Sequence, residues 1–185
     1  MASSIGHHGG MGSSSSGVRL RRAEPNDNDA VATVHVRSWQ AAYRGLLPDD
    51  YLEALEASDR ASRYTFGDVG SVAPVTTVAV DGQVICGFAT TGPCRDSDAS
   101  DAGEVLGIYV DPDWWDQGVG RMLIRDARDR MAAQGFPDAV LRVLVGNERA
   151  KRFYRLDGWI PDGQRRDEVV HGMTVDELRY RRPLP

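Results

Sequence analysis

The sequence has little of what marks secreted, membrane or nucleic-acid-binding proteins. Its only two cysteines, Cys86 and Cys94, show neither CxxC nor metal-ligand spacing, which argues against a disulfide framework and favours a reduced, cytoplasmic protein. No run of about eighteen apolar residues is present, and the first residues do not form a signal peptide, so we expect neither export nor membrane insertion. A formal net charge of -5 argues against nucleic acid as a partner, because phosphate neutralisation needs a concentrated positive face.

The 185-residue length favours one domain, which we expect to span residues 18–185. Residues 1–17 are rich in glycine and serine and hold almost nothing to bury, so they are predicted to be a flexible tail or tag remnant. His7 and His8 belong to this tail and are interpreted as part of it rather than as a metal site. No metal requirement is expected elsewhere in the chain.

Apolar periodicity predicts alternating strands and helices over the remaining chain. Strands are expected from Val18 and over residues 74–80, 83–91, 104–110, 139–145, 158–163 and 174–182, and helices over 29–44, 48–57, 119–134 and 147–157. The dipeptide Asp81-Gly82 is typical of a two-residue hairpin turn. The strand, helix and strand over residues 104–145 predict two parallel strands with a right-handed crossover, and therefore an α/β fold.

The stretch DQGVGRMLIRDA, residues 116–127, places two glycines before an amphipathic helix. It lacks the third glycine of a dinucleotide-binding loop, because Leu123 stands in that place, and it lacks the Gly-Lys-Ser/Thr ending of a mononucleotide P-loop. The unpaired amides at the start of such a helix nevertheless suit a pyrophosphate. From this stretch alone, phosphate binding and a simple tight turn are equally supported.

Taken together with its neighbours, this stretch resembles part of a known family. The two signature segments of the GNAT N-acetyltransferase superfamily are similar to EVLGIYVDPDWWDQGVGRMLI and NERAKRFYRLDGW. The second reads NxxAxxxYxxxG followed by an aromatic residue, and weaker likeness extends to WQAAYRGLLPDDYLEAL and DELRYRRPL. The resemblance implies a GNAT fold, with a mixed central sheet of about six or seven strands that contains a splayed parallel pair, and helices on both faces. It also implies acetyl-CoA as cosubstrate.

The resemblance implies which residues bind acetyl-CoA. The main chain of residues 108–110 would meet the pantetheine arm, and the glycine loop would hold the pyrophosphate. Trp115 departs from the family pattern, which usually has Gln or Arg at that position, so affinity is expected to be weaker, with Gln117 and Arg121 as partial substitutes. Asn147 is in addition a candidate N-cap. The full predicted set is Ile108, Tyr109, Val110, Gln117, Gly118, Val119, Gly120, Arg121, Asn147, Ala150 and Phe153.

Two residues are predicted to be catalytic by the same resemblance. Tyr154 matches the tyrosine that protonates the departing thiolate of coenzyme A, a role suited to a phenol with a pKa of about 10. Glu104 falls where histone-acetylating relatives carry a base that acts through water, and an ordinary carboxylate at a strand edge is the alternative. Asp98, Asp101 and His171 are weaker candidates for the base.

The predicted function is therefore transfer of an acetyl group from acetyl-CoA to a primary amine by direct attack in a ternary complex. The acceptor is a small molecule or an amine of a peptide or protein, and Trp39 and Tyr43, four residues apart, either border its pocket or pack in the core. A non-catalytic regulatory module that binds CoA is the alternative, and the intact Tyr154 argues against it. Homodimers are common in the family, although no heptad or apolar patch in the sequence predicts one.

Overall fold

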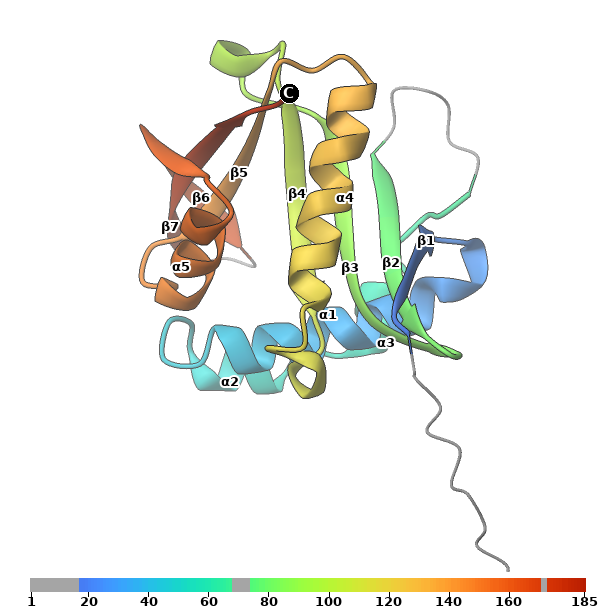
Figure 1. The fold of residues 1–185 in the computed structure, drawn as a ribbon. Helices are drawn as coiled ribbons and strands as arrows, with labels where there is room; N and C mark the ends of the chain where they lie inside the picture. Colours follow the sequence, from blue (N-terminus) through green and yellow to red (C-terminus); the bar gives the residue numbers. More distant parts are fainter. Residues whose placement is uncertain (1–16, 68–73, 171–172) are drawn as a thin grey trace, which may run out of the picture.

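The computed structural model describes residues 17–67, 74–170 and 173–185, and a seven-stranded sheet runs through them in the order β1-β2-β3-β4-β5-β7-β6 (Figure 1). The strands are β1 (Arg19–Arg22), β2 (Val75–Asp81), β3 (Val84–Pro93), β4 (Gly103–Val110), β5 (Asp138–Leu144), β6 (Ile160–Val170) and β7 (Met173–Pro183). All paired neighbours are antiparallel except β4 and β5, which are parallel. The mixed sheet with one parallel pair is confirmed.

Helices lie on both faces of the sheet, as predicted. They are α1 (Asn28–Ala42), α2 (Asp49–Glu53), α3 (Ala57–Ala61), α4 (Val119–Ala133) and α5 (Glu148–Leu156), with short 3-10 turns at Pro25–Asp27, Ser97–Ala99 and Pro112–Trp114. The α1 residues Val31 and Val34 pack against Phe88 of β3. On the opposite face, α4 and α5 pack together against β5 and β7. In the described part of the chain, no helix has the length and apolarity to cross a membrane.

In helix α4, the apolar residues that recur at helical spacing in the sequence form part of the core. Its residues Val119, Leu123, Ala127 and Met131 recur at helical spacing, and each is at most 2% exposed. Ala127 and Met131 pack on β5, and Val119 and Leu123 pack on β2 and β3. The helix therefore spans the sheet from β2 and β3 to β5, across β4.

The β2–β3 hairpin is confirmed, with its turn one residue later than the dipeptide suggested. Asp81 pairs with Val84, so the two loop residues are Gly82 and Gln83. Gly82 has a φ of +60°, the left-handed conformation that the tight hairpin turns require and that glycine adopts without strain. Both cysteines, Cys86 in β3 and Cys94 after it, are free and buried, as expected for a chain without disulfides.

Two elements differ from the prediction. The helix expected over residues 48–57 ends at Glu53, and the chain is extended at Glu56 before α3 begins, which allows Leu52 and Leu55 to pack against β7. The strand expected over residues 158–163 instead runs through Ile160–Val170, with a bulge near its start. Its residues are mostly polar, so no apolar alternation signalled it, and pairing with β7 defines it instead.

Candidate active site

Strands β4 and β5 part along their length. They pair only where residues 103–105 face residues 139–141, although β4 continues to Val110 and β5 to Leu144 (Figure 1). Residues 103–105 are buried, whereas residues 106–110 are all partly exposed. The register of β4 against β3 also shifts beside Leu106, and such a bulge bends a strand. The splayed parallel pair predicted from the resemblance is therefore present.

The alternation of strand hydrogen bonds decides which main-chain groups of β4 face the gap. The Asp111 amide donates to the Cys86 carbonyl at 2.9 Å, so Asp111 and Tyr109 turn their main-chain groups toward β3. Ile108 and Val110 accordingly turn theirs toward β5, which does not pair with them. The sequence prediction named all three residues, but the structure brings only Ile108 and Val110 to the gap by their main chain.

The loop between β4 and α4 presents main-chain amides. Asp116 and Gly118 have φ of +61° and +86°, and alternating left-handed residues of this kind form concave nests of N–H groups. No described residue accepts a hydrogen bond from the amides of Val119, Gly120 or Arg121, which lie at the positive end of the α4 dipole. The Gln117 side chain turns back to the Asp113 carbonyl at 2.8 Å. The donor set therefore fits a diphosphate.

Trp115 is fastened to the end of β4. Its indole nitrogen donates to the Val110 carbonyl at 2.8 Å, and the Arg149 guanidinium lies 4.0 Å from the centre of its ring. Arg149 also approaches Asp116 at 3.4 Å. The side chain at this unusual loop position thus has structural partners in β4 and α5, which the sequence did not reveal.

Helix α5 carries the second signature segment beside the gap. Asn147 is its N-cap, with a side-chain oxygen that accepts from the Ala150 amide at 3.0 Å, as the sequence suggested. The Phe153 ring contacts Tyr154 and packs over Gly120 at the start of α4. Ala150 and Phe153 are partly buried against the core, so the helix is held against the loop by packing.

Tyr154 is 7% exposed and packs in the core cluster with Val105 and Val143 from the two diverging strands. No described residue forms a hydrogen bond with its hydroxyl. Burial raises the pKa of Tyr154, and the nearby Tyr109 adds to this shift. Burial likewise raises the pKa of Tyr43, with further contributions from Tyr109 and Tyr154. These phenols are therefore protonated at neutral pH.

The predicted acceptor-side residues belong to a row of aromatic rings on α1. Trp39 meets Tyr43 edge-on with ring centres 5.0 Å apart, and the Arg60 guanidinium lies 5.4 Å from the centre of the Trp39 ring. His35, one turn before Trp39, stacks on the Tyr109 ring at 4.4 Å. Sequence reasoning missed His35 and the Tyr109 ring, although the spacing of His35, Trp39 and Tyr43 places them on one helix face. A separate hollow of about 280 Å³ beside β2 and β3 contains none of the predicted site residues.

Glu104 lies in the paired half of β4 and is 4% exposed. Its carboxylate accepts three hydrogen bonds from Arg95, at 3.2 Å from the main-chain amide, 3.1 Å from Nε and 2.9 Å from Nη2. The pairing raises the pKa of Arg95, whose side chain is 63% exposed. The alternative of a strand-edge carboxylate in contact with solvent is therefore wrong, and Glu104 is a buried carboxylate covered by the exposed side chain of Arg95.

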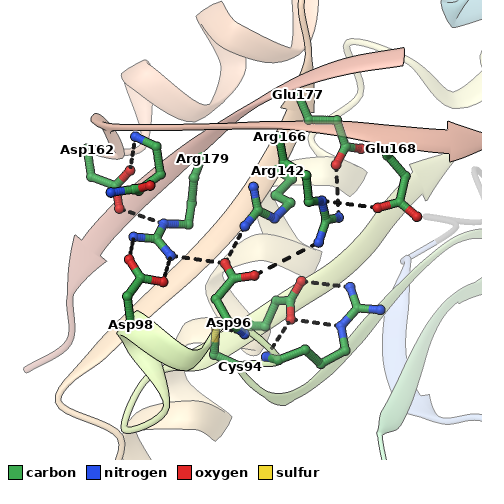
Figure 2. Close-up of polar contacts among 12 residues, drawn as sticks. Cys94, Asp96, Asp98, Arg142, Asp162, Arg166, Glu168, Glu177 and Arg179 are labelled. Carbon is green, nitrogen blue, oxygen red and sulfur yellow. Dashed lines mark hydrogen bonds and ion pairs between the residues drawn. The ribbon is translucent and has the colours of Figure 1, made fainter. Parts of the chain in front are cut away.

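A separate ionic network lies beside this pair and crosses β5, β7 and β6 (Figure 2). Its centre is Arg179, with a side chain only 3% exposed, which donates to Asp96, Asp98 and Asp162 at 3.0, 2.7 and 2.7 Å. Asp96 also pairs with Arg142. Sequence reasoning did not find this network, because its members come from separate strands and loops that only the sheet register brings together.

The structure describes two of the three weaker candidates for the base, Asp98 and Asp101. Asp98 accepts hydrogen bonds from Arg179, which lower its pKa, so it is a poor proton acceptor at neutral pH. Asp101 is exposed and makes no ion pair within residues 17–67, 74–170 and 173–185. His171 lies outside the described residues. In those same residues, no group of three or more His, Cys, Asp or Glu side chains is arranged to hold a metal ion.

Comparison with known proteins places this geometry in a family. Residues 35–159 match the model of the acetyltransferase (GNAT) family. The N-acetyltransferase YuaI of Bacillus subtilis is 30% identical over 131 residues, which span 70% of this chain and 73% of that protein. The PaiA N-acetyltransferase of Thermoplasma acidophilum, solved with coenzyme A, is similar in fold with a TM-score of 0.66 at 17% identity, covering 90% of this chain and 99% of that one. YncA of Salmonella typhimurium, solved with acetyl-CoA, has a TM-score of 0.68 at 21% identity, with 92% and 95% covered. The chain belongs to the acetyltransferase (GNAT) family and is an acyltransferase.

Proposed function

We propose that the enzyme transfers the acetyl group of acetyl-CoA directly to a primary amine of a small molecule, peptide or protein within a ternary complex. The observation that carries this proposal is the parting of β4 from β5 after Val105, with the largely buried Tyr154, whose hydroxyl has no partner among the described residues, packed beside it. The structures of similar fold that contain CoA or acetyl-CoA support the choice of donor. When bound, acetyl-CoA supplies an acetyl group activated as a thioester.

Main-chain groups of two segments suit the diphosphate and the pantetheine arm of acetyl-CoA. The open amides of Val119, Gly120 and Arg121, with the α4 dipole behind them, are matched to the charge of a diphosphate. Ile108 and Val110 offer the unpaired edge of β4 to an extended, amide-bearing arm, in the manner of an added strand. The Val110 carbonyl is already taken by Trp115, so its amide and both groups of Ile108 remain.

Tyr154 is the proposed general acid. Because burial keeps its hydroxyl protonated, it holds a proton next to the gap that a departing thiolate can take. Its ring is fixed between Phe153 and Trp159, so the position of the hydroxyl is set before a ligand arrives.

The acceptor amine must lose a proton before it can attack. At pH 7 this costs about 4.6 kcal/mol for a lysine-like amine and about 1 kcal/mol for an α-amino group. Glu104 is the proposed base, acting through water, but Arg95 occupies both of its oxygens. The exposed Arg95 side chain has to move aside for that role. An amine of low pKa therefore suits this site better than a lysine.

The experiment is a thiol-release assay on wild-type protein and Tyr154→Phe with panels of amines and peptides. We expect kcat to fall by about 10²- to 10⁴-fold, the contribution of general acid catalysis, with CoA affinity retained. Tyr180→Phe is the matched control, since it removes a buried hydroxyl from the same core and should leave kcat unchanged. An unchanged kcat in Tyr154→Phe would contradict the acid role. CoA binding without thiol release for any acceptor would favour the non-catalytic module.

A further inference from the structure

Arg149 of α5 contacts the loop that leads to the α4 amides, through Trp115 and Asp116. Its guanidinium is 4.0 Å from the centre of the Trp115 ring, and Trp115 is itself anchored by the hydrogen bond to the Val110 carbonyl. We infer that Arg149, held on Trp115, is a ligand of the CoA diphosphate and supplies from α5 the polar side chain that the loop lacks at position 115. The inference rests on the proposed use of acetyl-CoA.

The stacking leaves the donors of Arg149 free. A guanidinium that lies on an aromatic ring uses its flat face, while its N–H groups point outward in the plane that matches phosphate oxygens. Asp116 is the only described residue that accepts from it, through one Nη2 contact of 3.4 Å. The remaining donors of Arg149 have no acceptor in the described part of the chain.

A simple surface ion pair does not account for this arrangement. Asp116 is 88% exposed and Arg149 is 52% exposed, and at 3.4 Å such a pair contributes almost nothing measurable. Trp115, by contrast, is partly buried and hydrogen-bonded, so it is a defined platform. The ring contact, not the ion pair, positions the guanidinium.

The charge around the loop also favours an anion there. The chain carries a formal net charge of -5, which disfavours a polyanionic ligand over most of its surface. Beside the open amides, the exposed side chains of Arg121 at the start of α4 and of Arg149 add positive charge, and Arg37 pairs with Asp111 and Asp113 of the same loop. Among these, only Arg149 is fixed by an aromatic contact.

Calorimetry with the full chain tests the inference, using CoA, dephospho-CoA and pantetheine as probes. Arg149→Ala should weaken CoA and dephospho-CoA equally, by about tenfold, the value of one charge-assisted hydrogen bond, and should leave pantetheine within about twofold. Arg152→Ala is the matched control, an exposed arginine of the same helix with no partner among the described residues, and its effect should stay within about twofold.

Substitutions at Trp115 separate the platform from the charge. Trp115→Phe retains a ring and should keep Kd within about threefold of wild type, whereas Trp115→Leu should lose about tenfold. Arg149→Ala added to Trp115→Leu should then cause little further loss, because the tryptophan acts through the arginine. Circular dichroism melts establish that each variant is folded.

Three outcomes would overturn the inference. If Arg149→Ala binds CoA as tightly as Arg152→Ala does, the Arg149 guanidinium is a solvated surface charge. A loss seen with CoA but not with dephospho-CoA assigns Arg149 to the 3′-phosphate instead. If the wild-type protein binds neither CoA nor dephospho-CoA, the proposed function is refuted and the inference with it. If the wild-type protein binds both and Arg149→Ala binds them equally well, only the inference is refuted.

Discussion

Replacing Arg179 with methionine removes the centre of the ionic network on the sheet face opposite α5. The side chain of Arg179 is 3% exposed, so its charge is stabilised almost entirely by protein groups. Without it, Asp96 keeps its pairing with Arg142, but Asp162 retains, among the described residues, only the hydrogen bond from the Gln164 amide. Methionine preserves the unbranched apolar stem, so the expected effect is mainly that of leaving the partly buried Asp162 carboxylate without its cationic partner.

The expected loss of stability is large but not sufficient to unfold the protein. Removing one partner of a buried ion pair costs about 3–5 kcal/mol in general. The side chain of Asp98 is 52% exposed and Asp96 retains a partner, so we expect about 3 kcal/mol, the lower end of that range. At about 2–4 °C per kcal/mol for a chain of this size, Tm should fall by about 6–12 °C.

Urea denaturation followed by circular dichroism measures this loss. Arg165→Met is the matched control, because Arg165 pairs with Asp176 on the same two strands while its side chain is 60% exposed, and it should cost under about 1 kcal/mol. Equal losses in the two variants would refute the reasoning that burial makes the Arg179 network important. Unchanged urea m-values would confirm that both variants unfold by the same transition.

The same substitution has a pH signature. The hydrogen bonds from Arg179 lower the pKa of Asp98 in the folded protein. The unfolded chain therefore binds this proton more readily, and the stabilisation is present above about pH 4 and lost as the pH falls through the folded pKa. Arg179→Met should show a flatter decline of stability below about pH 4 than wild type.

Two further predictions concern single residues of the site. Burial lowers the pKa of His35 to about 3, so only the unfolded chain gains a proton as the pH falls below about 6.5, and wild-type stability should drop by up to about 1.4 kcal/mol per pH unit there. His35→Gln should flatten that slope in urea titrations between about pH 6.5 and 4.5, and an unchanged slope would show that another group titrates. Gly118→Ala forces a side chain into a φ of +86° and should cost about 1–2 kcal/mol. Gly120→Ala, whose new Cβ meets Phe153 at 3.4 Å, should stay within about 1 kcal/mol, and equal losses in thermal melts would contradict the backbone argument.

Several parts of the site were predictable from local sequence. Asn147 and Tyr154 lie seven residues apart on one helix, so their spacing alone places them about two turns apart on one face. Gly118 before an amphipathic run predicted both the turn and the start of α4, and the order of strand, helix and strand predicted the parallel pair. These features depend on short-range backbone preferences and on the spacing of apolar residues along the chain.

Other parts depended on contacts that no local pattern encodes. Arg95 covers Glu104 because a loop returns beside the start of β4, and Arg149 reaches Trp115 because α5 packs against the α4 entrance. The strand register likewise turned the main chain of Tyr109 away from the gap.

The sequence by itself determined the family, the α/β order and the positions of Tyr154 and the glycine loop, because each is carried by consecutive or helically spaced residues. Only the tertiary structure decided that Glu104 is buried under Arg95 and that Arg179 joins three carboxylates. Pairing between charged side chains depends on sheet register and loop packing over separations as long as 83 residues, and those distances are set only when the whole sheet has formed.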